Sequence, residues 1–325
     1  MGNRIKNILF NALRFFIATL LMFLILRSID FVPILGRIKT VNLLWLLLGF
    51  LLTLFLICLN AIRWKILLKT HNVNLSVWKL FRVYLIGFFF NNFLPSSIGL
   101  DTVRTVYLRQ HGLKEVASSV IIERFIGVIS LFIYMFIGFM FIERTKIDFN
   151  IILYSMIFLL VLILMFFLLF NKRIVSVFKP LVLKIRYKNI GSMAIEFYKT
   201  FLEYANNKKD LLLALLTSFL IQTVVIFINI TIAKMYYIDI GIVHFFSFIP
   251  IISVLSMIPV SINAIGIREG AYVYFFTMAG ITKEMALLMS LSFLVVTAMT
   301  SLIGGVLFVF EKGNKKLEKS NNKCR

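Results

Sequence analysis

The sequence predicts an all-α polytopic membrane protein, on the basis of its composition, its charge and its apolar runs. Hydrophobic residues make up 61% of the 325 residues, and the mean hydropathy is +0.97. A soluble protein contains about 45–50% apolar residues. A formal charge of +21 is typical of nucleic-acid binders and disordered basic chains, but such proteins lack this apolar content. We therefore expect the charge to lie in loops between membrane-spanning helices.

Six apolar runs are long enough to cross the ~30 Å hydrocarbon core of a bilayer, which takes about 20 helical residues. Four are uninterrupted, whereas the first contains Arg14 and the third contains Glu123 and Arg124. No small-residue cleavage site follows the first run, so we interpret it as a retained helix rather than a signal peptide. The predicted spanning helices are residues 8–26, 43–62, 117–142, 150–170, 211–233 and 286–310.

The distribution of Lys and Arg orients these helices, because cytoplasmic loops carry the excess of basic residues. Four segments together hold 23 basic residues, and the other short loops hold seven. We expect these four segments, with both termini, on the cytoplasmic side of the plasma membrane. They are residues 1–14, 63–82, 171–209 and 311–325.

Two further apolar regions must each enter and leave the membrane on one side if this orientation is to hold. The first, residues 80–116, stops at Pro95 after an apolar segment of only 15 residues. The second, residues 244–281, is interrupted by Pro250 and Pro259. We therefore predict about six spanning helices plus two oppositely oriented re-entrant helical hairpins.

The predicted elements form an inverted repeat within a single membrane domain, residues 1–325. The first repeat covers about 43–142 and the second about 211–310, and their hairpin tips, PSSIGL and PVSINAIGI, are weakly similar. An amphipathic cytoplasmic loop, 171–209, separates the repeats, and a basic tail, 311–325, follows them. Inverted repeats with broken helices near the bilayer midplane are typical of transporters.

Candidate functional residues gather at the two hairpins, where ionisable groups at membrane depth cost roughly 2.5–3.5 kcal/mol each. Arg binds phosphate through its two-pronged guanidinium group, and helix N-termini favour anions. We predict a lipid-headgroup site made of Arg104, Arg124, Arg268, Asn91, Ser97 and Asn263. The predicted coupling or ion-pairing residues are Asp101, Glu123 and Glu269, and the predicted hinges are Pro95, Gly99, Pro259 and Gly266. The alternative is that each acid–Arg pair only neutralises its charges and holds a broken helix in place.

The sequence predicts neither a metal site nor a cofactor. His71, His111 and His244 are spread along the chain, and Cys58 and Cys324 do not have the spacing of a zinc site. The basic excess lies in loops beside apolar runs, so we expect no nucleic-acid partner.

Several motifs carry a resemblance to a known family. They are Arg63-Trp64, FNNFLPSSIGLDTVR at 90–104, ERFIG at 123–127 and IPVSINAIGIREG at 258–270. Over nearly its whole length the chain resembles the lysylphosphatidylglycerol synthase transmembrane region, a flippase-type membrane domain. The chain departs from the usual family pattern at Ser96, Ser97, Leu100 and Ala264, where glycines are common, and at Glu123, where Asp is common. The resemblance implies a protein that moves, or helps to modify, a polar lipid in the cytoplasmic membrane.

Three functional hypotheses follow. The leading one is a flippase-like transporter of a polar lipid, with an anionic phospholipid as the expected partner. The second is the membrane part of a lipid-modifying enzyme of the phosphatidylglycerol lysyltransferase type, with Asp101, Glu123 or Glu269 as acid or base. The third is a small-solute transporter. In bifunctional family members a soluble lysyltransferase domain follows, but this sequence ends 15 residues after Phe310, so we expect no such activity from this chain alone. A separate lipid-modifying enzyme and a second copy of the chain are further candidate partners.

Overall fold

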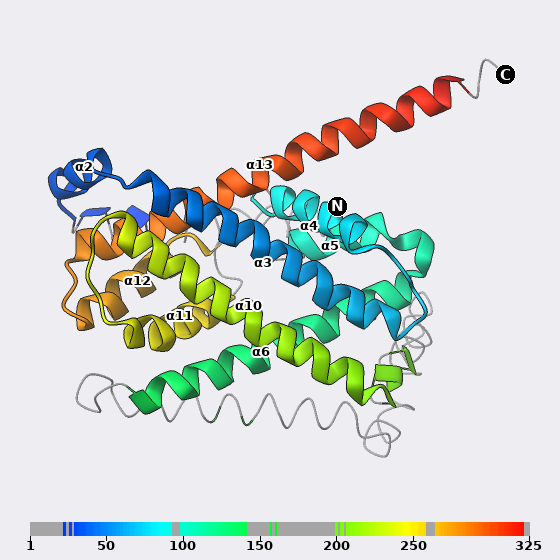
Figure 1. Ribbon diagram of the computed structural model, residues 1–325, viewed down its shortest axis with the longest axis horizontal. Coiled ribbons are helices and arrows are strands. Elements are labelled where there is room, and N and C mark those ends of the chain that lie inside the picture. The colour runs from blue at the N-terminus through cyan, green and yellow to red at the C-terminus, as the bar shows by residue number, and fades with distance from the viewer. Residues whose placement is uncertain are drawn as a thin grey trace, which may run out of the picture.

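The structure, a computed structural model, is helical throughout the part of the chain that it describes (Figure 1). No strand occurs among these residues, so the predicted all-α class is confirmed there. The described residues are 22–23, 26–27, 29–92, 98–141, 157, 160, 199–200, 202–204, 206–257 and 264–321.

Four long helices frame the molecule, and each contains a stretch that is long and apolar enough to cross a membrane. They are α3 (Leu43–Lys69), α6 (Leu113–Phe141), α10 (Lys208–Met235) and α13 (Lys283–Asn321). These helices confirm four of the six predicted spans, although α3 continues past residue 62 and α6 begins before residue 117. The other two predicted spans, 8–26 and 150–170, lie almost entirely outside the described residues.

Polar side chains mark where several helices begin. Asn42 caps α3, Ser76 caps α4 (Val77–Asn91) and Asp30 caps α2 (Phe31–Lys39). Each side chain accepts a hydrogen bond of 3.0–3.2 Å from a backbone N–H in the first turn. Such caps satisfy N–H groups that have no partner within the helix.

Each predicted hairpin region contains two short helices separated by a break. The first pair is α4 and α5 (Ile98–Tyr107), and the second is α11 (Ile242–Ser256) and α12 (Ile267–Met278). A single 3-10 turn, η1 (Arg109–His111), joins α5 to α6. Both α4 and α11 have 15 residues, fewer than the roughly 20 needed for a full crossing. The tip residues Pro95, Ser97, Pro259 and Asn263 lie outside the described residues.

The second break turns sharply just before α12. Gly266 has a φ of 88° and Ala264 has a φ of 58°. Glycine adopts this left-handed backbone freely, whereas for a residue with a Cβ this conformation is less stable by roughly 1–2 kcal/mol. The turn therefore suits glycine at position 266 and strains the alanine at position 264.

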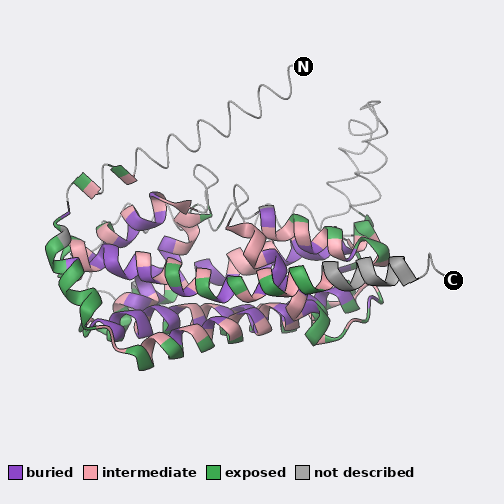
Figure 2. Ribbon diagram, turned by 90° about the horizontal axis from the view of Figure 1, so that it is seen from above, coloured by how far each residue is buried: buried purple, intermediate pink, exposed green. Residues whose placement is uncertain are grey.

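The helices α3 and α10 lie side by side and antiparallel across the molecule (Figure 1). The start of α3 meets the end of α10, where the Asn42 N–H donates to the Met235 carbonyl over 3.1 Å. Buried side chains line the faces that the helices turn toward one another (Figure 2). One cluster includes Phe245, Phe248 and Phe276, and a second surrounds Trp64 and Tyr84 between α3 and α4.

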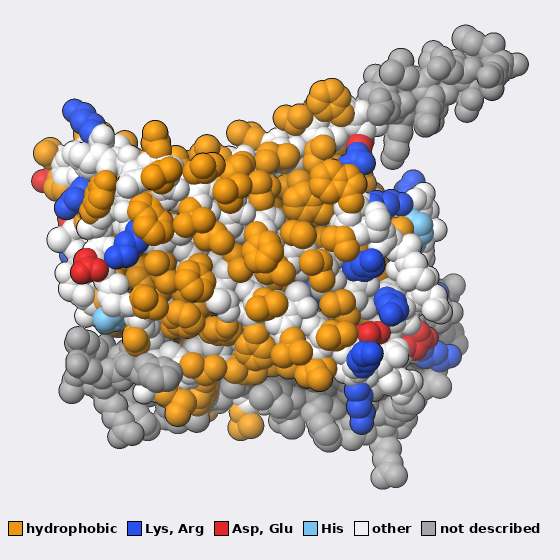
Figure 3. Space-filling model, viewed as in Figure 1, with side chains coloured by type: hydrophobic (Ala, Val, Ile, Leu, Met, Phe, Trp, Pro, Cys, Tyr) orange, Lys and Arg blue, Asp and Glu red, His pale blue; other side chains and the backbone are white. Residues whose placement is uncertain are grey.

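The outer face of the long helices is apolar. Hydrophobic side chains cover its broad middle, whereas Lys and Arg gather toward its two ends (Figure 3). Leu44 on α3 is 76% exposed and Phe310 on α13 is 67% exposed. Soluble proteins rarely expose so large a continuous apolar surface, and a bilayer covers it at no cost.

Candidate functional site

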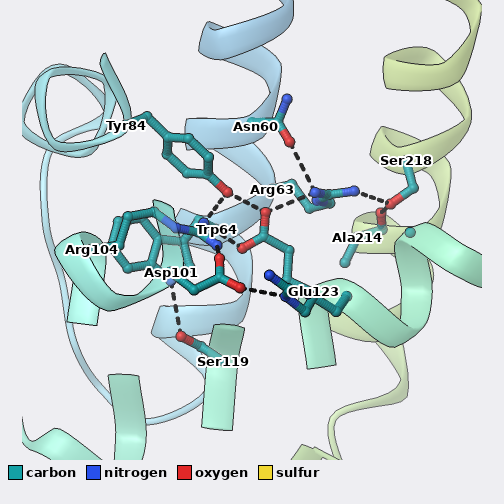
Figure 4. A network of polar contacts seen from close by, with 12 residues as sticks. Asn60, Arg63, Trp64, Tyr84, Asp101, Arg104, Ser119, Glu123, Ala214 and Ser218 are labelled. Carbon is teal, nitrogen blue, oxygen red and sulfur yellow. Dashed lines mark hydrogen bonds and ion pairs between the residues drawn. The ribbon is translucent and has the colours of Figure 1, made fainter. Parts of the chain in front are cut away.

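Five charged side chains form one connected network between α3, α5 and α6 (Figure 4). They are Arg63, Asp101, Arg104, Glu123 and Arg124. At the centre is Glu123 on α6, whose side chain is only 3% exposed. One carboxylate oxygen accepts from Nη2 of Arg63 and the other accepts from Nη1 of Arg104, both over 2.7 Å. Two guanidinium groups from different helices therefore hold the carboxylate between them.

Tyr84 on α4 adds a third donor to this carboxylate. Its hydroxyl donates to Oε1 of Glu123 and accepts from Nη1 of Arg104. A carboxylate buried away from water needs several hydrogen-bond donors to remain charged. With two guanidinium groups and a phenol around it, Glu123 is stabilised as an anion.

Arg63 extends the network from the first half of the chain to the second. Its Nη2 also donates to Oδ1 of Asn60, one turn earlier on α3, over 2.9 Å. Its Nη1 donates to Oγ of Ser218 on α10, also over 2.9 Å. The same guanidinium group thus contacts α3, α6 and α10.

Arg104 on α5 is enclosed by aromatic rings. Its guanidinium carbon lies 4.3 Å from the ring centre of Tyr84 and 4.9 Å from that of Trp64. The Trp64 indole N–H donates to Oγ of Ser119 on α6 over 2.9 Å, which fixes the ring. A cation over an aromatic face gains electrostatic attraction, most of all where water is excluded. The Arg104 side chain is 3% exposed, so its position is set by these contacts.

Asp101 and Arg124 form the accessible rim of the network. Oδ1 of Asp101 accepts from Nη2 of Arg104 over 2.5 Å, and Oδ2 accepts from Nε of Arg124. The Asp101 side chain is 16% exposed and that of Arg124 is 38% exposed. Among the described residues, three cations and two anions give this network a net charge of +1.

The predicted pair on the second hairpin forms a separate cluster at the start of α12. Nη2 of Arg268 donates to Oε1 of Glu269 over 2.8 Å, and Oε2 accepts from the Gly266 N–H over 2.6 Å. Ser290 on α13 donates to the same carboxylate over 3.3 Å. Glu269 therefore caps its own helix, where the positive end of the helix dipole favours an anion. Within the part of the chain that the structure describes, Arg268 pairs with Glu269 and not with a member of the network around Glu123.

Residues 11–305 match the sequence family described as the lysylphosphatidylglycerol synthase TM region. The chain belongs to this family. It is also similar to UPF0104 membrane protein PH1989 of Pyrococcus horikoshii, with 26% identity over 82% of this chain and 87% of the relative. No solved structure matches the chain significantly. The match to this family confirms the resemblance that the sequence motifs indicated. Together with the four long apolar helices, it identifies the chain as a multi-pass membrane protein.

Two further predicted site residues lie close to the first break in this family member. Gly99 is buried in the first turn of α5. Asn91 is the last residue of α4, and its Oδ1 is buried without a hydrogen-bond partner among the described residues. The neighbouring Asn92 donates to Oγ of Ser301 on α13 over 2.7 Å, which ties the end of α4 to the second half.

Sequence reasoning missed Arg63, Tyr84, Asn60 and Ser218 as members of the network. Arg63 was counted with the basic residues of a cytoplasmic loop, but α3 continues to Lys69 and buries it. The available signal was the spacing of Asn60 and Arg63, which places both on one face of a continuing helix. Nothing in the sequence distinguishes Tyr84 or Ser218 from other polar residues in apolar helices.

Proposed function

We propose that this protein moves a polar lipid across the cytoplasmic membrane and that the headgroup binds at the rim formed by Asp101 and Arg124. The observation that carries the proposal is the charged network itself, which lies among apolar helices beside the break between α4 and α5. Ionisable groups at membrane depth are costly and commonly mark a substrate path. The net charge of +1 and the exposed guanidinium group of Arg124 suit an anionic headgroup.

The packing of the helices supports an inverted repeat. When α3, α4, α5 and α6 are exchanged for α10, α11, α12 and α13, each closely packed pair among these helices corresponds to another closely packed pair. For example, α4 packs against α13 as α11 packs against α6, and α3 packs against α6 as α10 packs against α13. In our proposal α4/α5 and α11/α12 are re-entrant hairpins from opposite faces, and rocking of the two halves alternates access to the headgroup.

Two glycines make matching contacts in this arrangement. A Cβ on Gly304 of α13 would overlap the Leu85 carbonyl of α4 and lie 2.9 Å from the Ile86 nitrogen. A Cβ on Gly138 of α6 would lie 2.5 Å from Cα of Ser247 on α11. In each half, a long helix therefore reaches the backbone of the other half's first short helix. Close approach of this kind is what glycine permits within membranes.

We propose different roles for the three arginines that the sequence predicted as headgroup ligands. Arg104 is enclosed and paired with two carboxylates, so we propose that it holds the shape of the site. Arg124 at the rim is the proposed ligand of the headgroup in the first half. Arg268 lies on α12, the counterpart of α5 in the second half, and would contact the headgroup at a later position along the path.

The coordination of two carboxylates disfavours an enzyme that uses them as acid or base. Glu123 accepts from Arg63, Arg104 and Tyr84. Glu269 accepts from the Gly266 N–H and from Arg268. A carboxylate that is held as an anion by several donors is a poor general acid, because protonation breaks those hydrogen bonds.

Reconstitution into proteoliposomes tests the proposal. Fluorescent phosphatidylglycerol would be placed in both leaflets, and its exposure to an external quencher would be followed with time. We expect Arg124→Ala to slow translocation about tenfold or more, because a charge-assisted hydrogen bond contributes roughly 1.5–3 kcal/mol. Arg109→Ala, which removes an exposed arginine on η1, is the control and should leave the rate unchanged. Wild-type rates in both Arg124→Ala and Arg268→Ala would refute the proposed site.

A further inference from the structure

The carboxylate of Asp101 joins two guanidinium groups, one through each oxygen. Oδ1 accepts from the enclosed Arg104 over 2.5 Å, whereas Oδ2 accepts from Nε of Arg124 at the rim. A non-bridging oxygen of a phosphodiester can make the contact that Oδ2 makes with Arg124, because carboxylate and phosphate offer similar acceptor geometry to arginine. Asp101 therefore occupies the position on Arg124 that the phosphate of a bound headgroup would need.

We propose that Asp101 is an internal competitor for this position and that a phosphodiester headgroup displaces it from Arg124. The proposal rests on the function proposed above and names the step by which the site admits its ligand. Only the contact with Arg124 is exchanged. Asp101 keeps its hydrogen bond to Arg104, so no carboxylate is left unpaired in the interior.

The charge balance of the network favours this exchange. Arg63, Arg104 and Arg124 carry three positive charges, and Asp101 and Glu123 carry two negative charges. A phosphodiester contributes one negative charge and brings the total to zero. A charge that is removed from water is stable only beside an opposite charge. The anion that neutralises the excess positive charge of the network is therefore bound most strongly.

Unpaired hydrogen-bond donors in the network give a second reason to expect that an anion binds there. The Nε atoms of Arg63 and Arg104 are buried without an acceptor among the described residues. Among the described residues, the network therefore has more donors than acceptors, even with Asp101 in place. An additional anion at the rim adds acceptors to this set of described residues, whereas an additional cation would worsen both balances.

An internal competitor also selects among anions. Displacing Asp101 costs the same free energy for every ligand. For a lipid, contact of the acyl chains with the apolar helices offsets this free energy. Free phosphate has no acyl chains, so we expect it to bind weakly to the wild-type protein. Neutralising residue 101 should remove this discrimination.

The experiment is calorimetric titration of the full chain in a neutral maltoside detergent, with two probes used separately. The probes are dioctanoylphosphatidylglycerol and inorganic phosphate. We expect Asp101→Asn to bind the lipid roughly tenfold more tightly than the wild-type protein and to acquire measurable phosphate binding. Arg124→Ala should lose lipid binding. Asp239→Asn is the matched control, because it makes the same change in an ion pair whose carboxylate is 97% exposed, and it should bind as the wild-type protein does.

The outcomes separate this proposal from the proposed function. If the wild-type protein binds the lipid and Asp101→Asn binds it equally or less tightly, displacement is refuted and the transport proposal stands. If neither protein binds the lipid, the proposed function fails and displacement fails with it. If phosphate binds the wild-type protein as tightly as the lipid does, the site takes a free anion and the lipid function is refuted. Should Asp101→Asn and Asp101→Ala both fail to fold, Asp101 is a required structural brace and the displacement proposal is overturned.

Discussion

Replacing Glu123 by Gln tests whether the buried network stabilises the fold. The substitution keeps the shape of the side chain but removes the charge that Arg63 and Arg104 share, each over 2.7 Å. Among the described residues, the net charge of the network rises from +1 to +2, and Asp101, which pairs with Arg104 and Arg124, is the carboxylate that remains. Removing one partner from a buried ion pair costs about 3–5 kcal/mol. We therefore expect the free energy of unfolding of Glu123→Gln to fall by about that amount.

Equilibrium unfolding in mixed detergent micelles, followed by circular dichroism, measures this change. Asp239→Asn is the control, because it likewise neutralises a carboxylate, here in a pair with Lys234 whose side chains are 97% and 48% exposed. An exposed pair contributes less than about 1 kcal/mol, so the control should unfold almost as the wild-type protein does. A loss below about 1 kcal/mol in Glu123→Gln would refute the reasoning and show that the network is not held by this carboxylate.

Two further predictions concern the backbone. Gly304→Ala and Gly138→Ala should each destabilise the protein by about 1–3 kcal/mol, because the new Cβ overlaps the backbone of a neighbouring helix. Gly36→Ala, on α2 with nothing within 4 Å of the new Cβ, is their control and should be neutral or stabilising by about 0.5–1 kcal/mol. Ala264→Gly should stabilise the protein slightly, by about 0.5 kcal/mol, since relief of the left-handed strain at φ 58° exceeds the added flexibility of the unfolded chain. Thermal unfolding in detergent measures all four variants, and wild-type stability in both Gly304→Ala and Gly138→Ala would contradict the close packing.

The fold was predictable where a single physical requirement dominates. A bilayer core of about 30 Å demands long apolar helices, so composition and run length were enough to find α3, α6, α10 and α13. The short apolar run that stops at Pro95 likewise indicated a break, and α4 ends there at Asn91. Helix ends were less predictable. Charge alone put the end of the second predicted span at residue 62, but burial of Arg63 against Glu123 lets α3 continue to Lys69.

The candidate site was predictable only for contacts that are local in sequence. Asp101 and Arg104 lie three residues apart and so share one face of α5, which sequence spacing can indicate. Arg63 and Glu123 are 60 residues apart, and their meeting depends on how α3 and α6 are rotated and packed. The rule that places basic residues in cytoplasmic loops cannot tell a solvated arginine from a buried one. Arg63 was therefore counted as a determinant of orientation, although it is buried and connects α3 to α6 and α10.

Oppositely charged residues that are adjacent in the sequence do not have to form an ion pair with each other. Glu123 and Arg124 are neighbours on α6, but a helix turns by about 100° per residue, so their side chains leave it in different directions. Glu123 enters the interior and joins Arg63 and Arg104, whereas Arg124 reaches Asp101 at the rim. One dipeptide thus supplies both the buried brace and the exposed cation. In the proposed function, the brace holds the site in shape while the exposed cation binds and releases the headgroup, and consecutive positions on a rigid helix keep the two side chains in fixed relation.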